Sequence, residues 1–173
     1  SFTYVFPDYR GYGKSRHLTG QYTMREIAAD MIALVDQLGW RRFHMIGHSM
    51  GAMAMQRLLV DIDDLLRVKS AVAITPVPAC GAQLDQDSWS TFEASVSDDN
   101  SRYLITDFTT GKRLPSAWIR AMVQKSRETT TESAYYGYLK AWVYDDFTDQ
   151  VRGINTPILV SVGECDYAIT EAS

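Results

Sequence analysis

The sequence predicts an α/β protein whose sheet is mostly parallel, with helices on both faces and a helical insertion before the last strand. Short apolar runs alternate with helical segments along the 173-residue chain, and such runs indicate parallel strands buried on both faces. Between residues 77 and 149 helical patterns dominate instead. We therefore expect a first part of the core in residues 1–76, a helical lid in residues 77–149, and a return to the core in residues 150–173.

Four segments are expected to form strands. Each is a short run of β-prone or apolar residues, and most of the runs stop at proline or glycine. In chain order they are residues 3–6, 43–46, 68–74 and 157–163.

Two helices are expected between the early strands. Thr23 and Glu26 fit a capping box, in which a hydroxyl and a carboxylate accept hydrogen bonds from free N–H groups at the helix start. Apolar residues then recur at three- and four-residue steps, and Gly39 is expected to end the helix because glycine accepts the left-handed conformation. Good helix formers predict a second helix over residues 51–60.

Composition and charge argue against several classes of partner. The net charge of −4 offers no basic field for a polyanion, so we expect no nucleic-acid partner. No stretch approaches the roughly 20 apolar residues that a membrane span needs. Cys80 and Cys165 are far apart and in no metal-ligand spacing, so we expect free thiols in a reducing, cytoplasmic location.

The segment Gly47-His48-Ser49-Met50-Gly51 has the spacing of a nucleophile elbow, between an expected strand and an expected helix. The residues two before and two after the serine must be small, because the turn is tight, and glycine meets that demand. The turn would present the Ser49 hydroxyl at the helix start, where the backbone N–H of Met50 can donate to an oxyanion. The simpler alternative is a glycine-bounded loop whose serine caps a helix.

Three motifs resemble those of the α/β-hydrolase superfamily and occur in the family's order. Residues 7–15 (PDYRGYGKS) look like its D-x-R-G-x-G-x-S loop, residues 47–51 like its G-H-S-M-G elbow, and residues 154–166 like its I-x-x-P-x-L-x-x-x-G-x-x-D segment. The resemblance implies a lid-containing serine esterase or lactonase, with Asp166 as the acid of a Ser-His-Asp triad. The alternative for Asp166 is a loop carboxylate that caps a turn.

The histidine of that triad is not found where the pattern requires it. The family's order is serine, acid, histidine, and none of His17, His44 and His48 follows Asp166. His48 is the variable residue of the elbow and is expected to point away from the Ser49 hydroxyl. His44 is expected to be a core histidine, and His17 to approach the mouth of the pocket without being the base.

In the family, the loop after the third strand supplies a second oxyanion donor. The resemblance places both this strand and this loop before residue 1. That strand would lie between the strands expected at residues 3–6 and 43–46, and its loss would leave backbone groups unpaired. We therefore expect the sequence to be an interior portion of a longer enzyme, unable to fold stably or to hydrolyse esters alone.

The expected activity is two-step acyl transfer on a carboxylic ester or lactone, with no metal or organic cofactor. An apolar or aromatic substrate is expected if the insertion covers Ser49, although most aromatic residues of the insertion are expected to form its own small core.

Serine at the elbow argues against epoxide hydrolase or haloalkane dehalogenase chemistry. Cleavage of thioesters or C–C bonds, cofactor-free haloperoxidase side activity, and a non-catalytic ligand-binding member of the fold stay open. A phosphate-binding P-loop ending at Gly13-Lys14-Ser15 is disfavoured because Asp8 stands where it needs glycine.

Overall fold

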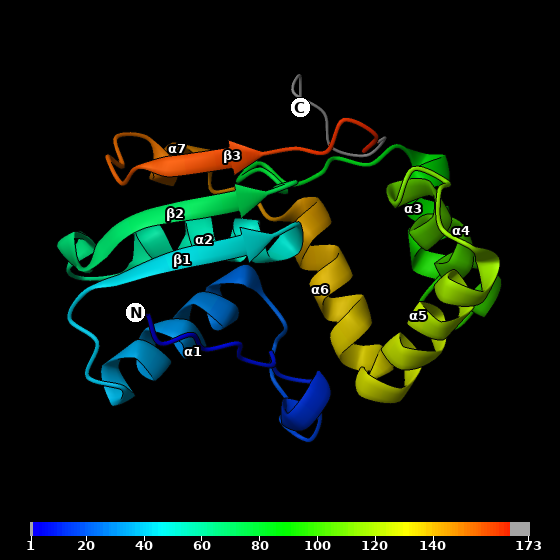
Figure 1. Cartoon of the computed structure of the whole chain (residues 1–173), viewed down its shortest axis with the longest axis horizontal. Helices are drawn as coiled ribbons and strands as arrows, with labels where there is room; N and C mark the ends of the chain where they lie inside the picture. Colours follow the sequence, from blue (N-terminus) through cyan, green and yellow to red (C-terminus); the bar gives the residue numbers. More distant parts are fainter. Residues whose placement is uncertain (1, 167–173) are drawn as a thin grey trace.

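The computed structural model describes residues 2–166. Within these residues the strands β1 (Phe43–His48), β2 (Val68–Ile74) and β3 (Ile158–Ser161) form a parallel sheet in the order β1-β2-β3. Since the strands are parallel, their carboxyl ends lie at one edge of the sheet (Figure 1). The three expected strands after the first are thus confirmed, with ends within two residues of the prediction.

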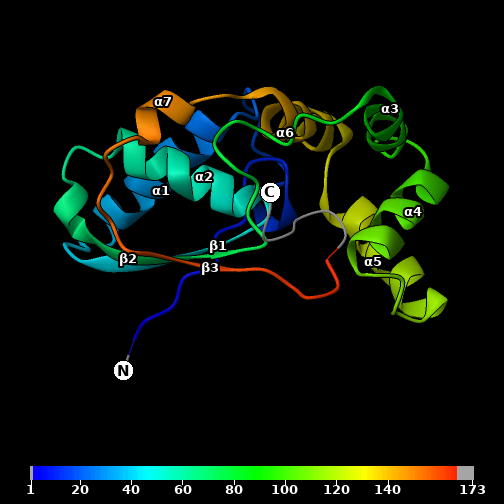
Figure 2. The ribbon, with the colours of Figure 1, turned by 90° about the horizontal axis from the view of Figure 1, so that it is seen from above.

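One face of this sheet is covered by α1 (Met24–Gln37), α2 (Met50–Asp61) and α7 (Thr148–Val151), as Figure 2 shows. Small residues let α2 approach the sheet closely, because Ala52 of α2 packs on Ala71 and Ala73 of β2. These apolar contacts hold the helix that begins at the elbow.

The opposite face carries no helix within residues 2–166. Ile46, Val72 and Leu159 are neighbours in the strand register and so share a face. Ile46 is 68% exposed and Leu159 is 65% exposed on that face. In the described part of the chain, helices therefore cover one face, where the sequence predicted both.

The strand expected at residues 3–6 does not form. These residues are irregular, and Phe6 is 90% exposed. A strand needs a neighbouring backbone to complete its hydrogen bonds. Among residues 2–166, β1 pairs with β2 alone, and no strand lies beside the first segment.

The start and the end of α1 agree with the sequence. The Glu26 N–H donates to the Thr23 hydroxyl over 3.1 Å, as the capping box requires. The Glu26 carboxylate accepts from the Tyr22 N–H, at 2.9 Å, one residue before the N-cap. Gly39 adopts a left-handed φ of 67° just beyond the helix, which confirms it as the residue that ends α1.

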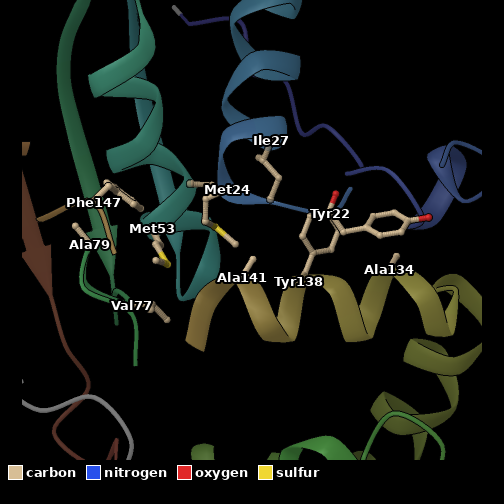
Figure 3. Close-up of a cluster of buried hydrophobic side chains, with 11 residues drawn as sticks. Tyr22, Met24, Ile27, Met53, Val77, Ala79, Ala134, Tyr138, Ala141 and Phe147 are labelled. Atoms are coloured by element: carbon tan, nitrogen blue, oxygen red, sulfur yellow. The ribbon is translucent and has the colours of Figure 1, made fainter. Parts of the chain in front are cut away.

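Between β2 and β3 the chain is mainly helical (Figure 1). The last helix of this insertion packs along the core: Tyr138 and Ala134 lie in one buried cluster with Tyr22 and Met24 of the α1 region (Figure 3). The helices α4 and α5 pack against each other farther from the sheet. The insertion consists of α3 (Gln86–Ala94), α4 (Asp99–Thr109), α5 (Ser116–Thr129) and α6 (Glu132–Tyr144), while the short 3₁₀ helices η1 (Gly13–Ser15) and η2 (Leu65–Arg67) lie before it.

A buried arginine joins the helices of the insertion. Arg102 on α4 donates from Nε to the Ser95 carbonyl oxygen over 3.0 Å and from Nη1 to the Ser126 hydroxyl over 2.9 Å. Its guanidinium also lies 4.0 Å from the centre of the Tyr135 ring on α6. Burial lowers the pKa of Arg102. The insertion therefore has a polar centre of its own that connects α3 to α6.

Other aromatic rings of the insertion pair within it. The ring centroids of Trp89 and Tyr144 lie 4.9 Å apart, and those of Phe92 and Trp142 lie 5.1 Å apart.

No helix in the described residues is both long and apolar enough to pass through a bilayer. The thiols of Cys80 and Cys165 are both free, as expected.

Candidate active site

Ser49 occupies a strained turn between β1 and α2. Its backbone has φ 52° and ψ −122°, a region that side-chain-bearing residues rarely adopt and that costs of order 1–3 kcal/mol. Its N–H donates to the Ile74 carbonyl oxygen over 2.9 Å, and its own carbonyl accepts from the Val77 N–H over 3.2 Å. The end of β2 therefore holds this strained backbone from both sides.

The two glycines of the motif are required by close approaches. A Cβ at Gly47 would lie 2.6 Å from the Ala52 Cα and 2.7 Å from the Gly51 carbonyl oxygen, both of which are backbone atoms. A Cβ at Gly51 would lie 3.2 Å from the Tyr9 hydroxyl. Position 47 therefore excludes any side chain, while position 51 tolerates one only if Tyr9 shifts.

Met50 is the first residue of α2. N–H groups of the first helical turn have no partner within the helix and carry its positive dipole end. The Met50 side chain is partly buried and packs against the cluster that contains Met53 and Tyr138. The backbone at the helix start is therefore anchored by apolar contacts beneath it.

Asp166 follows β3 at the same edge of the sheet where Ser49 follows β1. The Thr75 N–H, next to Ile74, donates to the Ser161 carbonyl oxygen over 2.7 Å, so the ends of β2 and β3 stay joined. Asp166 is half-buried, and its N–H donates to the Gly163 carbonyl oxygen over 3.0 Å in a turn. Ser49 and Asp166, the two residues that the sequence predicts to be catalytic, thus both follow the carboxyl ends of strands.

The loop before Asp166 also reaches the insertion. A Cβ at Gly111, in the connection between α4 and α5, would lie 2.7 Å from the Cys165 carbonyl oxygen. Gly111 has a left-handed φ of 70°. The connection that follows the carboxyl-terminal end of α4 therefore contacts the loop that carries the candidate acid.

The histidines lie outside this arrangement. His44 was expected in the core and is instead exposed, with Nδ1 2.8 Å from the Ser70 hydroxyl. The reason is strand alternation, which places His44 and His48 with Ile46 on the face that no described helix covers. His17 is exposed just after η1.

Tyr9 lies beside the elbow, although sequence reasoning did not select it. Its ring centroid lies 6.2 Å from that of Tyr138, and its hydroxyl approaches the elbow at Gly51. Burial raises the pKa of the Tyr9 phenol. Tyr9 stands at a variable position of the D-x-R-G-x-G-x-S loop, so the motif gives no signal for it.

Comparison with known proteins agrees with the geometry. Residues 1–167 match a family model described as alpha/beta hydrolase fold. The chain is 29% identical to a non-heme haloperoxidase of Rhodococcus erythropolis over 181 residues, which cover 96% of this chain and 65% of that protein. The chain therefore spans just under two thirds of the length of this relative.

Two solved structures have a similar backbone. An esterase from Exiguobacterium antarcticum superimposes with a TM-score of 0.82 at 19% identity, over 95% of this chain and 64% of that one. An N-acyl homoserine lactone degrading enzyme gives a TM-score of 0.75 at 23% identity, over 95% of this chain and 65% of that one. At these identities the likeness shows a shared fold and no more.

Proposed function

Because the chain belongs to the α/β-hydrolase fold family, we propose that it acts as a serine hydrolase that cleaves a carboxylic ester or lactone through Ser49. The observation that carries the proposal is the strained backbone of Ser49 at the start of α2. Strain in a residue other than glycine persists only where the surroundings impose it, and such residues cluster at functional sites. The hydrogen bonds of Ser49 to Ile74 and Val77 impose it here.

The proposed reaction has two steps. The Ser49 Oγ attacks the carbonyl carbon, and the Met50 N–H donates to the oxyanion that forms, with the positive end of α2 beside it. Collapse of this intermediate expels the alcohol and leaves an acyl group on Ser49. Water then attacks the acyl carbon, releases the carboxylic acid and restores the serine hydroxyl. In a lactone, the leaving alcohol remains attached to the acyl group.

Asp166 is proposed as the acid that orients and stabilises an imidazolium. Its position after β3, at the same sheet edge as Ser49, supports this role. The base is assigned to none of His17, His44 and His48, all of which are exposed. The proposed mechanism therefore requires an imidazole from outside the 173 residues.

Residues 77–149 are proposed as a lid over this site. The contact between Gly111 and Cys165 places one end of α4 at the acid loop. Leu104 and Phe108 lie one helical turn apart on that helix and are 59% and 44% exposed. We propose that these side chains contribute an apolar wall, which suits an apolar or aromatic group of the substrate.

A second candidate is formation of an oxidised halide, which the likeness to a non-heme haloperoxidase favours. It would use the same acyl-Ser49. Hydrogen peroxide in place of water would release a peracid, and the peracid would transfer one oxygen to a halide ion and leave the carboxylic acid. Both candidates therefore depend on the Ser49 hydroxyl.

The full-length protein is tested with 4-nitrophenyl butyrate, with and without the Ser49→Ala substitution. We expect the substitution to lower kcat/KM by about 10³-fold or more. Ser90→Ala, at an exposed serine on α3, is the matched control and should leave turnover within about twofold of the wild type. Turnover that survives Ser49→Ala would contradict the proposal. Bromide oxidation with peroxide and acetate then decides on the second candidate.

A further inference from the structure

The Tyr9 hydroxyl lies beside the first turn of α2. It would lie 3.2 Å from a Cβ built on Gly51. Gly51 is two residues after Ser49. The phenol is therefore close to the elbow.

The backbone around Tyr9 is held firmly. The Tyr9 carbonyl oxygen accepts from the Tyr12 N–H over 2.9 Å. The neighbouring Arg10 donates twice to the Asp30 carboxylate, at 2.7 and 2.8 Å, and the Gly11 carbonyl oxygen accepts from the Thr131 N–H of the insertion over 3.0 Å. Together with the ring contact to Tyr138, these bonds fix the position of the hydroxyl without using the hydroxyl itself.

Within residues 2–166 the hydroxyl of Tyr9 makes no hydrogen bond to another residue, whereas the Tyr103 hydroxyl bonds to Ser116 and the Tyr136 hydroxyl bonds to Glu93. Tyr12, Tyr22 and Tyr138 share this lack of a partner, so what distinguishes Tyr9 is the approach of its hydroxyl to Gly51. The only fully buried side-chain nitrogen or oxygen without a partner in this part of the chain is Arg127 Nη2. The Tyr9 hydroxyl therefore still reaches solvent-accessible space, where a ligand atom could pair with it.

We propose that the Tyr9 hydroxyl donates a hydrogen bond to a polar acceptor atom of the substrate close to the scissile carbonyl. The inference rests on the proposed function, and it narrows the substrate class. The preferred esters or lactones carry a second oxygen or nitrogen acceptor in the acyl or alcohol group that reaches the elbow. A site built to bond such an atom discriminates against an analogue that lacks it. The phenol is a neutral donor near neutral pH, since the ordinary pKa of tyrosine is about 10 and burial raises the pKa of Tyr9 further.

The test compares two esters that differ in one atom. In 4-nitrophenyl methoxyacetate, an ether oxygen replaces a methylene of 4-nitrophenyl butyrate, so chain length and leaving group are the same. For the full-length wild type and Tyr9→Phe, kcat/KM is measured on both. We expect the substitution to reduce the methoxyacetate-to-butyrate ratio by about fivefold. Tyr103→Phe, whose hydroxyl bonds within the insertion, is the control and should keep the wild-type ratio.

Three outcomes are separated by this design. Equal losses on the two esters, or no loss, would overturn the role of Tyr9. A clear fall in melting temperature on Tyr9→Phe would overturn it too, because the hydroxyl would then serve the fold. If the wild type hydrolyses neither ester, or if Ser49→Ala retains turnover, the proposed function itself fails, whatever Tyr9 does.

Discussion

The backbone N–H of Ser49 donates a hydrogen bond of 2.9 Å to the carbonyl oxygen of Ile74, the last residue of β2. The bond joins the turn after β1 to the neighbouring strand. A serine with φ 52° would relax in an isolated peptide, so the parallel pairing of β1 and β2 maintains the turn. The candidate nucleophile thus depends on the sheet as much as on its own motif.

Strain at Ser49 predicts the order of stability of two variants. Ser49→Gly and Ser49→Ala both remove the hydroxyl, but glycine accepts positive φ without a steric cost. We expect Ser49→Gly to be about 0.5–1 kcal/mol more stable than Ser49→Ala. Urea unfolding of the full-length variants measures the difference. Glycine is preferred to alanine at an unstrained N-cap as well, so both effects favour Ser49→Gly. A Ser49→Gly variant that is no more stable than Ser49→Ala would refute the strain.

Gly47 is predicted to tolerate no side chain. The added methyl of Gly47→Ala would meet backbone atoms of α2 at 2.6 to 2.8 Å, so the elbow would have to move, at a cost of about 3 kcal/mol in unfolding free energy. Gly163→Ala is the matched control, because among residues 2–166 its methyl would come no closer than 3.7 Å to an atom beyond its chain neighbours. Similar losses in the two variants would show that the contact at Gly47 does not constrain the turn.

Arg102 is predicted to stabilise the insertion. Arg102→Ala would leave the Ser95 carbonyl oxygen and the Ser126 hydroxyl without this donor, and we expect a loss of about 3 kcal/mol. Arg152→Ala removes an arginine whose side chain is 75% exposed and should cost well under 1 kcal/mol. Limited proteolysis between residues 77 and 149 reads out the difference. Equal protection of the two variants would contradict a structural role for Arg102.

Asp145, at the end of α6, gives a pH-dependent prediction. Burial raises the pKa of its carboxyl above the ordinary value. The folded protein therefore keeps this proton at pH values where the unfolded chain has lost it, so the contribution of Asp145 to stability falls as pH rises through the raised pKa. We expect Asp145→Asn to be more stable than the wild type at pH 7 and to lose this advantage near pH 3. An advantage that does not change with pH would contradict this account.

Most of the correctly predicted helix ends, strands and turns rest on local sequence signals. The capping pair Thr23 and Glu26, Gly39 after α1 and the apolar run of β2 each depend on neighbouring residues, and the structure has all of them. The glycines at 47 and 51 carried enough information to place the strained turn, because the geometry of the elbow requires small residues there.

The sequence predictions that were wrong or incomplete all concern positions that tertiary contacts decide. The β-prone residues 3–6 form no strand because no described strand lies beside them. His44 has the neighbours of a core residue but lies on the uncovered face, and nothing in the local sequence tells which face is covered. Tyr9 reaches Gly51 only because its loop is anchored to Asp30 and to the insertion. Such placements depend on partners far away in the sequence.

Covalent labelling measures whether Ser49 is an activated nucleophile. The full-length protein is incubated with a fluorophosphonate, its intact mass is measured, and the modified peptide is sequenced. We expect a single adduct on Ser49 that Ser49→Ala abolishes and Ser90→Ala leaves unchanged. A wild type without an adduct, or with the adduct on another residue, would contradict the account and leave only the fold.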